Sequence, residues 1–448
     1  MTRIKFHKFP FLLALTAAAF YWTFGYDLLR ADLWRLLMLY GALFFITWKF
    51  LQLEKNPKIL LLSAVIFRLV FLVSLPALSP DFYRFIWDGS LLLQGNNPLL
   101  ATPSEWMARL PEIPPLLAES YTGMTSLSRE NPSSYPPLKQ VLFAGSVALG
   151  GGTVLGTIVA TRMLLLFADL GTWFFGSRLL RYFHLPSERI YWYLLNPLII
   201  IELTGNLHFE GLMVFFLSAA LWLLTRNKVI PSSLVFSLSV LIKLLPLLLL
   251  PALFRFLRPR KAVVFYAINV AVVFLAFLPF LSWDSLWNYG ASLRLWFQDF
   301  EFNASLWYII RWIGFQMEGY NTLVYVGPVM AMTAAVVILG IGLIRKNATL
   351  KEVMTSMLFS LSVYFFLSST VHPWYLCTLV FLSIFTRYRF PIVWSLMVFL
   401  SYGAYSRAGH EENLWLIAAE YLVVFLVLIS EMRIGPRDLI FRSKSLSG

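Results

Sequence analysis

The sequence predicts an all-α, polytopic membrane protein with about 12–14 transmembrane segments. Hydrophobic residues make up 59% of the 448 residues and charged residues only 13%, roughly half the charged share of a soluble domain. Apolar stretches that can cross a ~30 Å hydrocarbon core recur along the whole chain. The formal net charge of +13 comes from cations in short runs between these stretches, which indicates membrane topology and not nucleic-acid binding.

The predicted spans follow one another from the N-terminus, and the first is interpreted as a retained span because no convincing small-residue cleavage site follows it. Segment 231–257 is apolar but interrupted by Lys243 and Pro246, which predicts two short helices in a hairpin. Segment 138–149 is too short to span and is expected to be tilted or re-entrant. The remaining predicted spans are 9–27, 33–51, 58–79, 155–179, 187–204, 208–225, 262–282, 323–344, 352–370, 372–386, 390–407 and 413–431.

The loops between these spans predict which side of the membrane they face. With the N-terminus in the cytoplasm, every loop on the cytoplasmic side carries Lys or Arg, and the C-terminus is cytoplasmic too. The outer side carries two long segments, which we expect to contain juxtamembrane helices and to serve the function. The chain then divides into the first three spans (1–79), the first outer loop (80–154), a middle group of spans (155–282), the second outer loop (283–322), and the C-terminal spans with a cytoplasmic tail (323–448).

The start of the first outer loop is the most informative stretch. Ser79 and Pro80 are typical of a helix N-cap and first turn, so a helix is expected to begin at the outer membrane surface with Asp81 in its first turn. The helix dipole favours an ionised carboxylate there. Asp81 and Asp88 would lie about 10 Å apart along the axis at ~1.5 Å per residue, too far to share one metal ion. One carboxylate acting as a base beside a separate cation is the simpler interpretation, although an acid in a first turn is as often only an end-charge.

Other polar residues are predicted on the same outer side from separate parts of the chain. Each of the outer histidines alone is more often an interfacial side chain bonded to backbone, and the Trp and Tyr enrichment is mostly interfacial. The convergence of the whole set favours a site. Lys243 would cost several kcal/mol if it were unpaired in the membrane. Arg162 and Asp169 of one span are expected to pair with other helices. The converging residues are Tyr135, Lys139, Glu202, Asn206, His208, Glu210, His372, Tyr375, Arg407 and His410.

A series of short motifs carries a resemblance to a known family. They are Asp-Phe-Tyr-Arg-Phe-Ile-Trp-Asp-Gly at 81–89, Gly-Asn-Asn-Pro at 95–98, Tyr-Pro-Pro-Leu at 135–138, Asn-Pro at 196–197 with Glu202, Gly-Asn-Leu-His at 205–208, Lys-Leu-Leu-Pro at 243–246, Phe-Asn-Ala-Ser at 302–305 and His-Pro-Trp-Tyr at 372–375. With these motifs in this order, the chain resembles the C-type-fold (GT-C) integral membrane glycosyltransferases. The resemblance is closest to bacterial polyprenol-phosphate-mannose-dependent mannosyltransferases and the GPI-mannosyltransferase-like family.

The resemblance implies a function and a membrane. It implies an inverting transferase that moves a hexose, with mannose favoured, from a polyprenyl-phosphate sugar to a hydroxyl of a glycan or glycolipid acceptor. The reaction would take place on the outer side of a bacterial inner membrane, with membrane lipids as the surroundings and no nucleic acid as partner. Many family members have adjacent acids where this chain has Pro80 and Asp81, so neither a metal nor a cofactor is expected.

The resemblance also implies roles for individual residues. Asp81 corresponds to the catalytic base, and Tyr135 and Lys139 are implied to lie near the lipid phosphate. Cations that hold a departing phosphate lower the barrier, which adds Arg84, Lys243 and Arg407 as donor-site candidates. The candidates for sugar and acceptor binding are Trp87, Asp88, Asn206, His208, Glu210, His372 and Tyr375.

Two other functions fit parts of the sequence. A polytopic transporter or lipid flippase would explain the broken hairpin at Lys243, but no inverted repeat is found and long aromatic outer loops have no transport rationale. A glycan ligase or polymerase would keep the outer site and use a polyprenyl-diphosphate donor. The single cysteine, Cys377, excludes an intrachain disulfide and a cysteine-built metal site.

Overall fold

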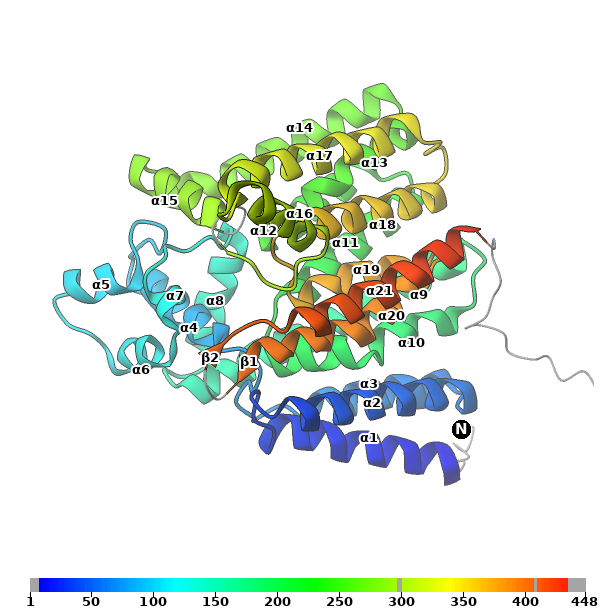
Figure 1. Cartoon of the computed structure of the whole chain (residues 1–448), viewed down its shortest axis with the longest axis horizontal. Coiled ribbons are helices and arrows are strands. Elements are labelled where there is room, and N and C mark those ends of the chain that lie inside the picture. The colour runs from blue at the N-terminus through cyan, green and yellow to red at the C-terminus, as the bar shows by residue number, and fades with distance from the viewer. Residues whose placement is uncertain (1–7, 296–299, 407–408, 434–448) are drawn as a thin grey trace, which may run out of the picture.

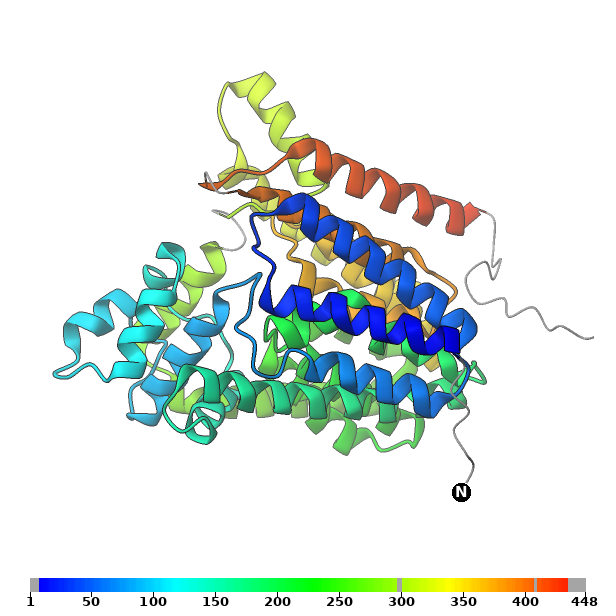
Figure 2. The same cartoon turned by 90° about the horizontal axis from the view of Figure 1, so that it is seen from below.

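The computed structural model describes residues 8–295, 300–406 and 409–433. Its long helices run side by side in one bundle, and helix α1 (Lys8–Tyr26) begins on the same face at which α21 (Leu414–Arg433) ends (Figures 1 and 2). We call this the terminal face. The opposite end, the loop face, carries a group of short helices: α4 (Asp81–Leu93), α5 (Pro103–Arg109), α6 (Pro115–Gly123), α7 (Ser126–Arg129), α8 (Pro137–Leu149) and α15 (Trp283–Arg294).

Seven helices in the described part of the chain are long and apolar enough to cross a membrane, which confirms the all-α polytopic class. Besides α1 and α21 they are α2 (Leu33–Leu53), α9 (Val154–Tyr182), α14 (Pro259–Phe277) with η4 (Leu278–Phe280), α17 (Leu323–Ile344) and α18 (Leu350–Leu367).

Other apolar segments are helical but shorter than a full crossing, so there are fewer continuous spans than the sequence predicted. Besides α8 they are α12 (Val229–Ile242), η3 (Leu245–Leu249) with α13 (Leu250–Leu257), η6 (Pro373–Leu376) with α19 (Cys377–Ser383), and α20 (Phe390–Met397) with η7 (Val398–Ala404). The expected interruption within 231–257 is found at Lys243, where α12 stops and the backbone is extended.

Two expected spans are broken. Helix α3 (Pro57–Leu69) stops well before residue 79, and an irregular segment leads from it to α4. Span 187–204 consists of η1 (Ser187–Ile190), α10 (Tyr191–Leu194) and a π-helix, η2 (Ile199–Gly205). Pro197 cannot donate to a helix, which explains the interruption before η2. Helix α11 (Glu210–Thr225) then follows η2 at an angle of 111°.

Buried charges of α9 hold these broken segments in place, which confirms that Arg162 and Asp169 contact other helices. Asp169 accepts from Arg68 of α3 at 2.6 Å, with both side chains buried. Arg162 donates to backbone carbonyls of the two irregular segments, among them Leu72 at 3.1 Å and Gly205 at 2.8 Å. Carbonyls that lost their helical partners are satisfied in this way. The chain segments that enter the loop face at residues 80 and 206 are therefore fixed.

The second outer loop contains helices, as expected. Helix α15 starts with a capping box at Ser282, and α16 (Leu306–Glu318) ends at Gly319 in the left-handed conformation. After η7 the chain forms a small antiparallel ribbon of β1 (Tyr405–Ser406) and β2 (Gly409–His410) that leads into α21.

Candidate active site

Asp81 is the first residue of α4, on the loop face of the bundle. Its backbone N–H donates to the hydroxyl of Ser79 at 3.3 Å, and its side chain is neither fully buried nor fully exposed. Burial raises the pKa of Asp81 above its ordinary value, while the Lys139 ammonium and the Ser79 hydroxyl act in the opposite direction. The helix dipole is expected to favour the ionised form of Asp81, but burial shifts its pKa in the opposite direction. The carboxyl combines partial access with an environment that increases its basicity.

Lys139 lies in the first turns of α8, inside a cage of aromatic rings. Its ammonium is 4.2 Å from the ring centroid of Tyr135 and between 5.1 and 5.7 Å from those of Phe85, Phe143 and Phe209. Such faces attract a cation but offer it no hydrogen bond. Burial lowers the pKa of Lys139 to about 8, against the opposing effect of the Glu210 carboxylate. The residue is therefore a cation near neutral pH whose hydrogen-bonding capacity is unused by the described residues.

A second cation lies beside this cage, where the α12 break meets the start of α11. The Lys243 ammonium is 2.6 Å from Oε1 of Glu210 and 3.4 Å from the ring centroid of Tyr375. Glu210 is almost fully buried, whereas about a quarter of the Lys243 side chain (26%) is exposed. The other carboxylate oxygen of Glu210, Oε2, has no hydrogen-bond partner among the described residues. The predicted residues Lys139, Glu210, Lys243 and Tyr375 thus belong to one electrostatic group with Asp81.

A stack of rings forms another part of this region. His208 stacks on Trp374 with centroids 3.7 Å apart, Trp374 stacks on His372 at 4.4 Å, and His372 stacks on Phe302 at 4.8 Å. Burial lowers the pKa of His372 to about 3, so its imidazole is neutral at pH 7. The two predicted histidines therefore meet through Trp374, as members of an aromatic surface and not as charged groups.

Three other predicted residues serve the packing of the first outer loop. Arg84 forms an ion pair with Asp88 at 2.8 Å and donates to two loop carbonyls. Asp88 also accepts from Ser133 and Gln140. Trp87 is fully buried in the small core that α4 shares with α5 and α6. Because their polar groups are already bonded or enclosed, we leave Arg84, Trp87 and Asp88 out of the function proposed below.

Asn206 also has a supporting place. Its side chain accepts from the backbone N–H of Leu78 at 3.1 Å and donates to Glu202 at 3.2 Å. Glu202 in turn accepts from the hydroxyl of Tyr402 at 2.6 Å. These bonds tie the approach to α4 to the π-helix η2 and to η7, so Asn206 positions Asp81 through the backbone. Arg407 lies outside the described residues.

Sequence reasoning missed one cation of this group. Arg30, in the short connection between α1 and α2, lies with its guanidinium 3.8 Å from the ring centroid of Tyr405 and donates to the carbonyl of Leu78 at 3.0 Å. Its charge also acts on Asp81. The available signal was an arginine on the outer side, where cations are otherwise scarce, but nothing in the sequence linked it to a loop fifty residues later.

The group as a whole has the parts that transfer of a group from a phosphate ester requires. A carboxylate of raised pKa can take a proton from a hydroxyl, and ammonium groups a short way off can stabilise an oxyanion. Aromatic rings can pack against the faces of a sugar or the start of an isoprenoid chain. In the described part of the chain, no cluster of three or more His, Cys, Asp or Glu side chains could hold a metal ion.

Comparison with known proteins gives the family. No curated protein matches the chain. The model of the family described as "Alpha-(1->6)-mannopyranosyltransferase, N-terminal domain" matches residues 13–258, which is more than half of the 448 residues. The matched region holds Asp81, Lys139, Glu210 and Lys243 and ends with the broken hairpin. The chain therefore belongs to this alpha-(1->6)-mannopyranosyltransferase family and is a mannosyl-transferring glycosyltransferase of the membrane.

Proposed function

We propose that the chain transfers mannose from a polyprenyl-phosphate donor to a hydroxyl of a glycan or glycolipid acceptor, with inversion at the sugar. The reaction takes place on the loop face, which we assign to the outer side of a bacterial inner membrane, with the terminal face in the cytoplasm. The observation that carries the proposal is the grouping of a partly accessible Asp81 with the caged Lys139 and the Lys243–Glu210 pair.

Asp81 acts as the general base in this proposal. It takes the proton of the acceptor hydroxyl as that oxygen attacks the anomeric carbon, the bond from this carbon to the phosphate oxygen breaks, and the lipid phosphate leaves as an anion. Lys139 and Lys243 stabilise the negative charge that develops on the phosphate. The donor's tail lies in the membrane and its phosphate at the surface, which suits cations placed where the bundle meets the loop helices. Tyr375 and Trp374 provide apolar surface for the sugar.

The family description names an alpha-(1->6) linkage, which we adopt for the proposed product. An alpha-(1->6) bond formed with inversion requires a donor in which the sugar is beta-linked to phosphate. The product's anomeric configuration therefore tests the mechanism independently of any variant. A beta-linked product from a beta-linked donor would exclude direct displacement.

The main experiment replaces Asp81 with asparagine. Purified protein in lipid nanodiscs is supplied with a polyprenyl-phosphate mannose and a short mannoside, and the product is quantified. Because a positioned base contributes about 10²–10⁴-fold, we expect kcat of D81N to fall by at least 10²-fold. The matched control is D284N: Asp284 is also an acid in a first turn on the loop face, at the start of α15, and it is exposed. A D81N variant with more than a tenth of the wild-type kcat would remove Asp81 from the mechanism.

A transporter or flippase is the second candidate, favoured by the two broken spans that meet at Glu210 and Lys243. Movement of a fluorescent donor lipid across a vesicle membrane, without product and unaffected by D81N, would favour this candidate. A polyprenyl-diphosphate sugar used in place of the monophosphate would instead indicate a ligase-type or polymerase-type donor.

A further inference from the structure

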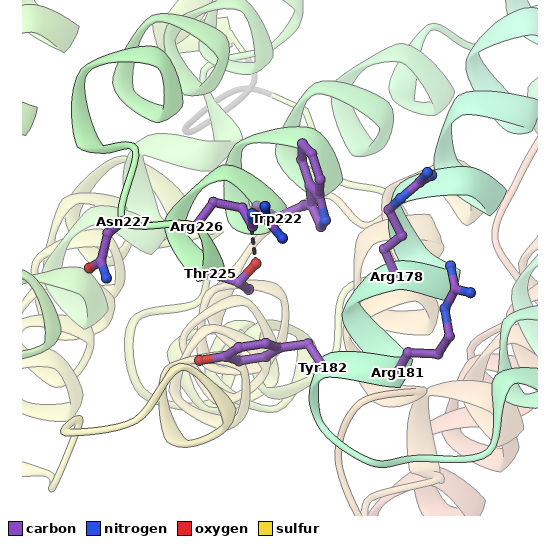
Figure 3. Close-up of a pocket in the computed structure, with 7 residues that line it drawn as sticks. All are labelled: Arg178, Arg181, Tyr182, Trp222, Thr225, Arg226 and Asn227. Carbon is purple, nitrogen blue, oxygen red and sulfur yellow. Dashed lines mark hydrogen bonds between the residues drawn. The ribbon is translucent and has the colours of Figure 1, made fainter.

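The terminal face carries a basic cavity far from the site described above. The cavity has a volume of about 490 Å³ and lies between the last turns of α9 and α11 (Figure 3). Three arginines line it: Arg178 and Arg181 from α9, and Arg226 directly after α11. Trp222 and Tyr182 provide aromatic walls. The proposed transfer reaction on the loop face gives this cavity no role.

The three guanidinium groups are not used to hold the protein together. Within the described residues, none of them donates a side-chain hydrogen bond or pairs with a carboxylate. Arg162 and Arg84 differ in this respect, since both donate to backbone carbonyls and Arg84 also pairs with an acid. Arg178 is nevertheless ordered, because its guanidinium lies 3.3 Å from the ring centroid of Phe174 and 5.9 Å from that of Trp222. A guanidinium held by a ring face keeps its N–H groups available at its edge for an anion.

The side chains around the cavity are of the kinds that contact lipid headgroups and lipid chains. On α9, Phe174 (41% exposed) and Phe167 (63% exposed) continue from the cavity toward the middle of the bundle. Trp and Tyr are typical of the depth where lipid headgroups lie. The negatively charged head of a lipid would contact the arginines, and its apolar chains would contact the exposed phenylalanines.

Two general effects account for part of this pattern. Cations in the last turn of a helix stabilise its carbonyl end, and basic loops set membrane orientation. Neither effect requires that arginines of two different helices line one cavity, or that aromatic side chains hold a guanidinium in place. These two features of the cavity therefore indicate a ligand site.

We propose that this cavity binds the phosphate group of an anionic phospholipid in the leaflet at the terminal face. Arg178, Arg181 and Arg226 contact the phosphate oxygens, and Trp222 and Tyr182 pack against the glycerol region. A phosphate with two ester links and apolar chains fits the exposed aromatic surface of α9, which a free inorganic anion would leave uncovered.

The test uses native mass spectrometry of the full chain with added phosphatidylglycerol or phosphatidylcholine. The variant R178Q/R181Q/R226Q is compared with R258Q/R260Q/K261Q, which removes the same charge from exposed residues at the start of α14. That helix runs from the terminal face toward α15. Each cation near an anionic headgroup is worth roughly a factor of five. We therefore expect roughly hundred-fold weaker phosphatidylglycerol binding in the first variant and wild-type binding in the control.

Several results would overturn the proposal. Equal losses in the two triple variants would mean that only the total surface charge matters. Equal binding of the two lipids would remove the anionic headgroup as the ligand. Inorganic phosphate that binds at this cavity in place of the lipid would replace the phospholipid with a free anion. If the triple variant does not fold, the single variant R178Q is tested in its place. We expect its phosphatidylglycerol binding to be roughly five-fold weaker. Unchanged binding in R178Q would refute the role of Arg178.

Discussion

Replacing Lys139 with methionine should make the protein more stable and at the same time less active. Lys139 is 5% exposed, and its ammonium lies among four aromatic rings. Its removal leaves a space that a flexible thioether can fill with favourable contacts to the same rings. The substitution therefore separates the cost of burying this charge from the phosphate binding that we propose for it.

The magnitude follows from the pKa of Lys139, which is lowered from 10.5 to about 8, mainly by burial. This difference corresponds to about 3 kcal/mol by which the folded protein disfavours the charged form. Below pH 8 both folded and unfolded chains carry the proton, and the full cost is present. Between pH 8 and 10.5 only the unfolded chain keeps it, so the free energy of unfolding of the wild type rises with pH in this window. The K139M variant has no such rise and is more stable at pH 7 by up to about 3 kcal/mol.

The functional effect has the opposite sign. A charged donor to a phosphate is worth about 1.5–3 kcal/mol, so kcat/KM for the donor should fall by roughly 10- to 100-fold in K139M. In the wild type, kcat/KM should decrease above pH 8 as Lys139 loses its proton. Thermal unfolding in detergent and steady-state kinetics from pH 6.5 to 9.5 measure both effects.

The comparison variant is K243M, which should lower both activity and stability. Lys243 is the ion-pair partner of the buried Glu210, and its loss leaves an uncompensated carboxylate, at a cost of no more than about 3 kcal/mol because part of the lysine is exposed to water. The reasoning about Lys139 fails if K139M is less stable than the wild type, or if its kcat/KM is unchanged.

Three further predictions concern the residues around the site. Arg162→Met should destabilise the protein by about 3 kcal/mol or more, measured by thermal unfolding, because buried carbonyls of two broken segments lose their donor. Asp88 neutralises the buried Arg84, so Asp88→Asn should increase proteolysis of the first outer loop. Its activity should fall only because less protein is folded, and the folded enzyme should keep the wild-type KM for the donor. Trp374→Ala should raise the acceptor or donor KM while circular dichroism stays helical, since it removes the middle ring between His208 and His372.

The helix that begins at Asp81 and the break at Lys243 could be predicted because each depends on local chemistry. Ser79 and Pro80 favour a helix start, although Pro80 and not Ser79 is the N-cap of α4. A lysine followed three residues later by a proline interrupts an apolar helix. The pairing of Arg84 could also be predicted, since an arginine and an aspartate four residues apart on a helix can form an ion pair.

The partners of Arg162 and Lys139 could not be predicted, because they are set by tertiary packing. The carbonyls that Arg162 contacts are free only because α3 ends early and η2 is a π-helix, and hydropathy does not report either event. The rings around Lys139 come from α4, α8 and the segment before α11, which approach one another only in the folded bundle. The position of Arg30 over Tyr405 joins opposite ends of the chain.

The two buried cations Arg162 and Lys139 differ in how their N–H groups are used, and this difference supports the separate roles that we propose for them. Arg162 donates to several carbonyls, so an added anion would have to displace bonds that already satisfy it. Lys139 is held by ring faces, which attract its charge without using its N–H groups. A buried cation without acceptors among the described residues lowers stability, and in the proposed mechanism a phosphate would supply the missing acceptors. Since only interactions that strengthen as charge develops raise the rate, we propose Lys139, whose N–H groups have no acceptor among the described residues, and not Arg162, as the cation for the leaving phosphate.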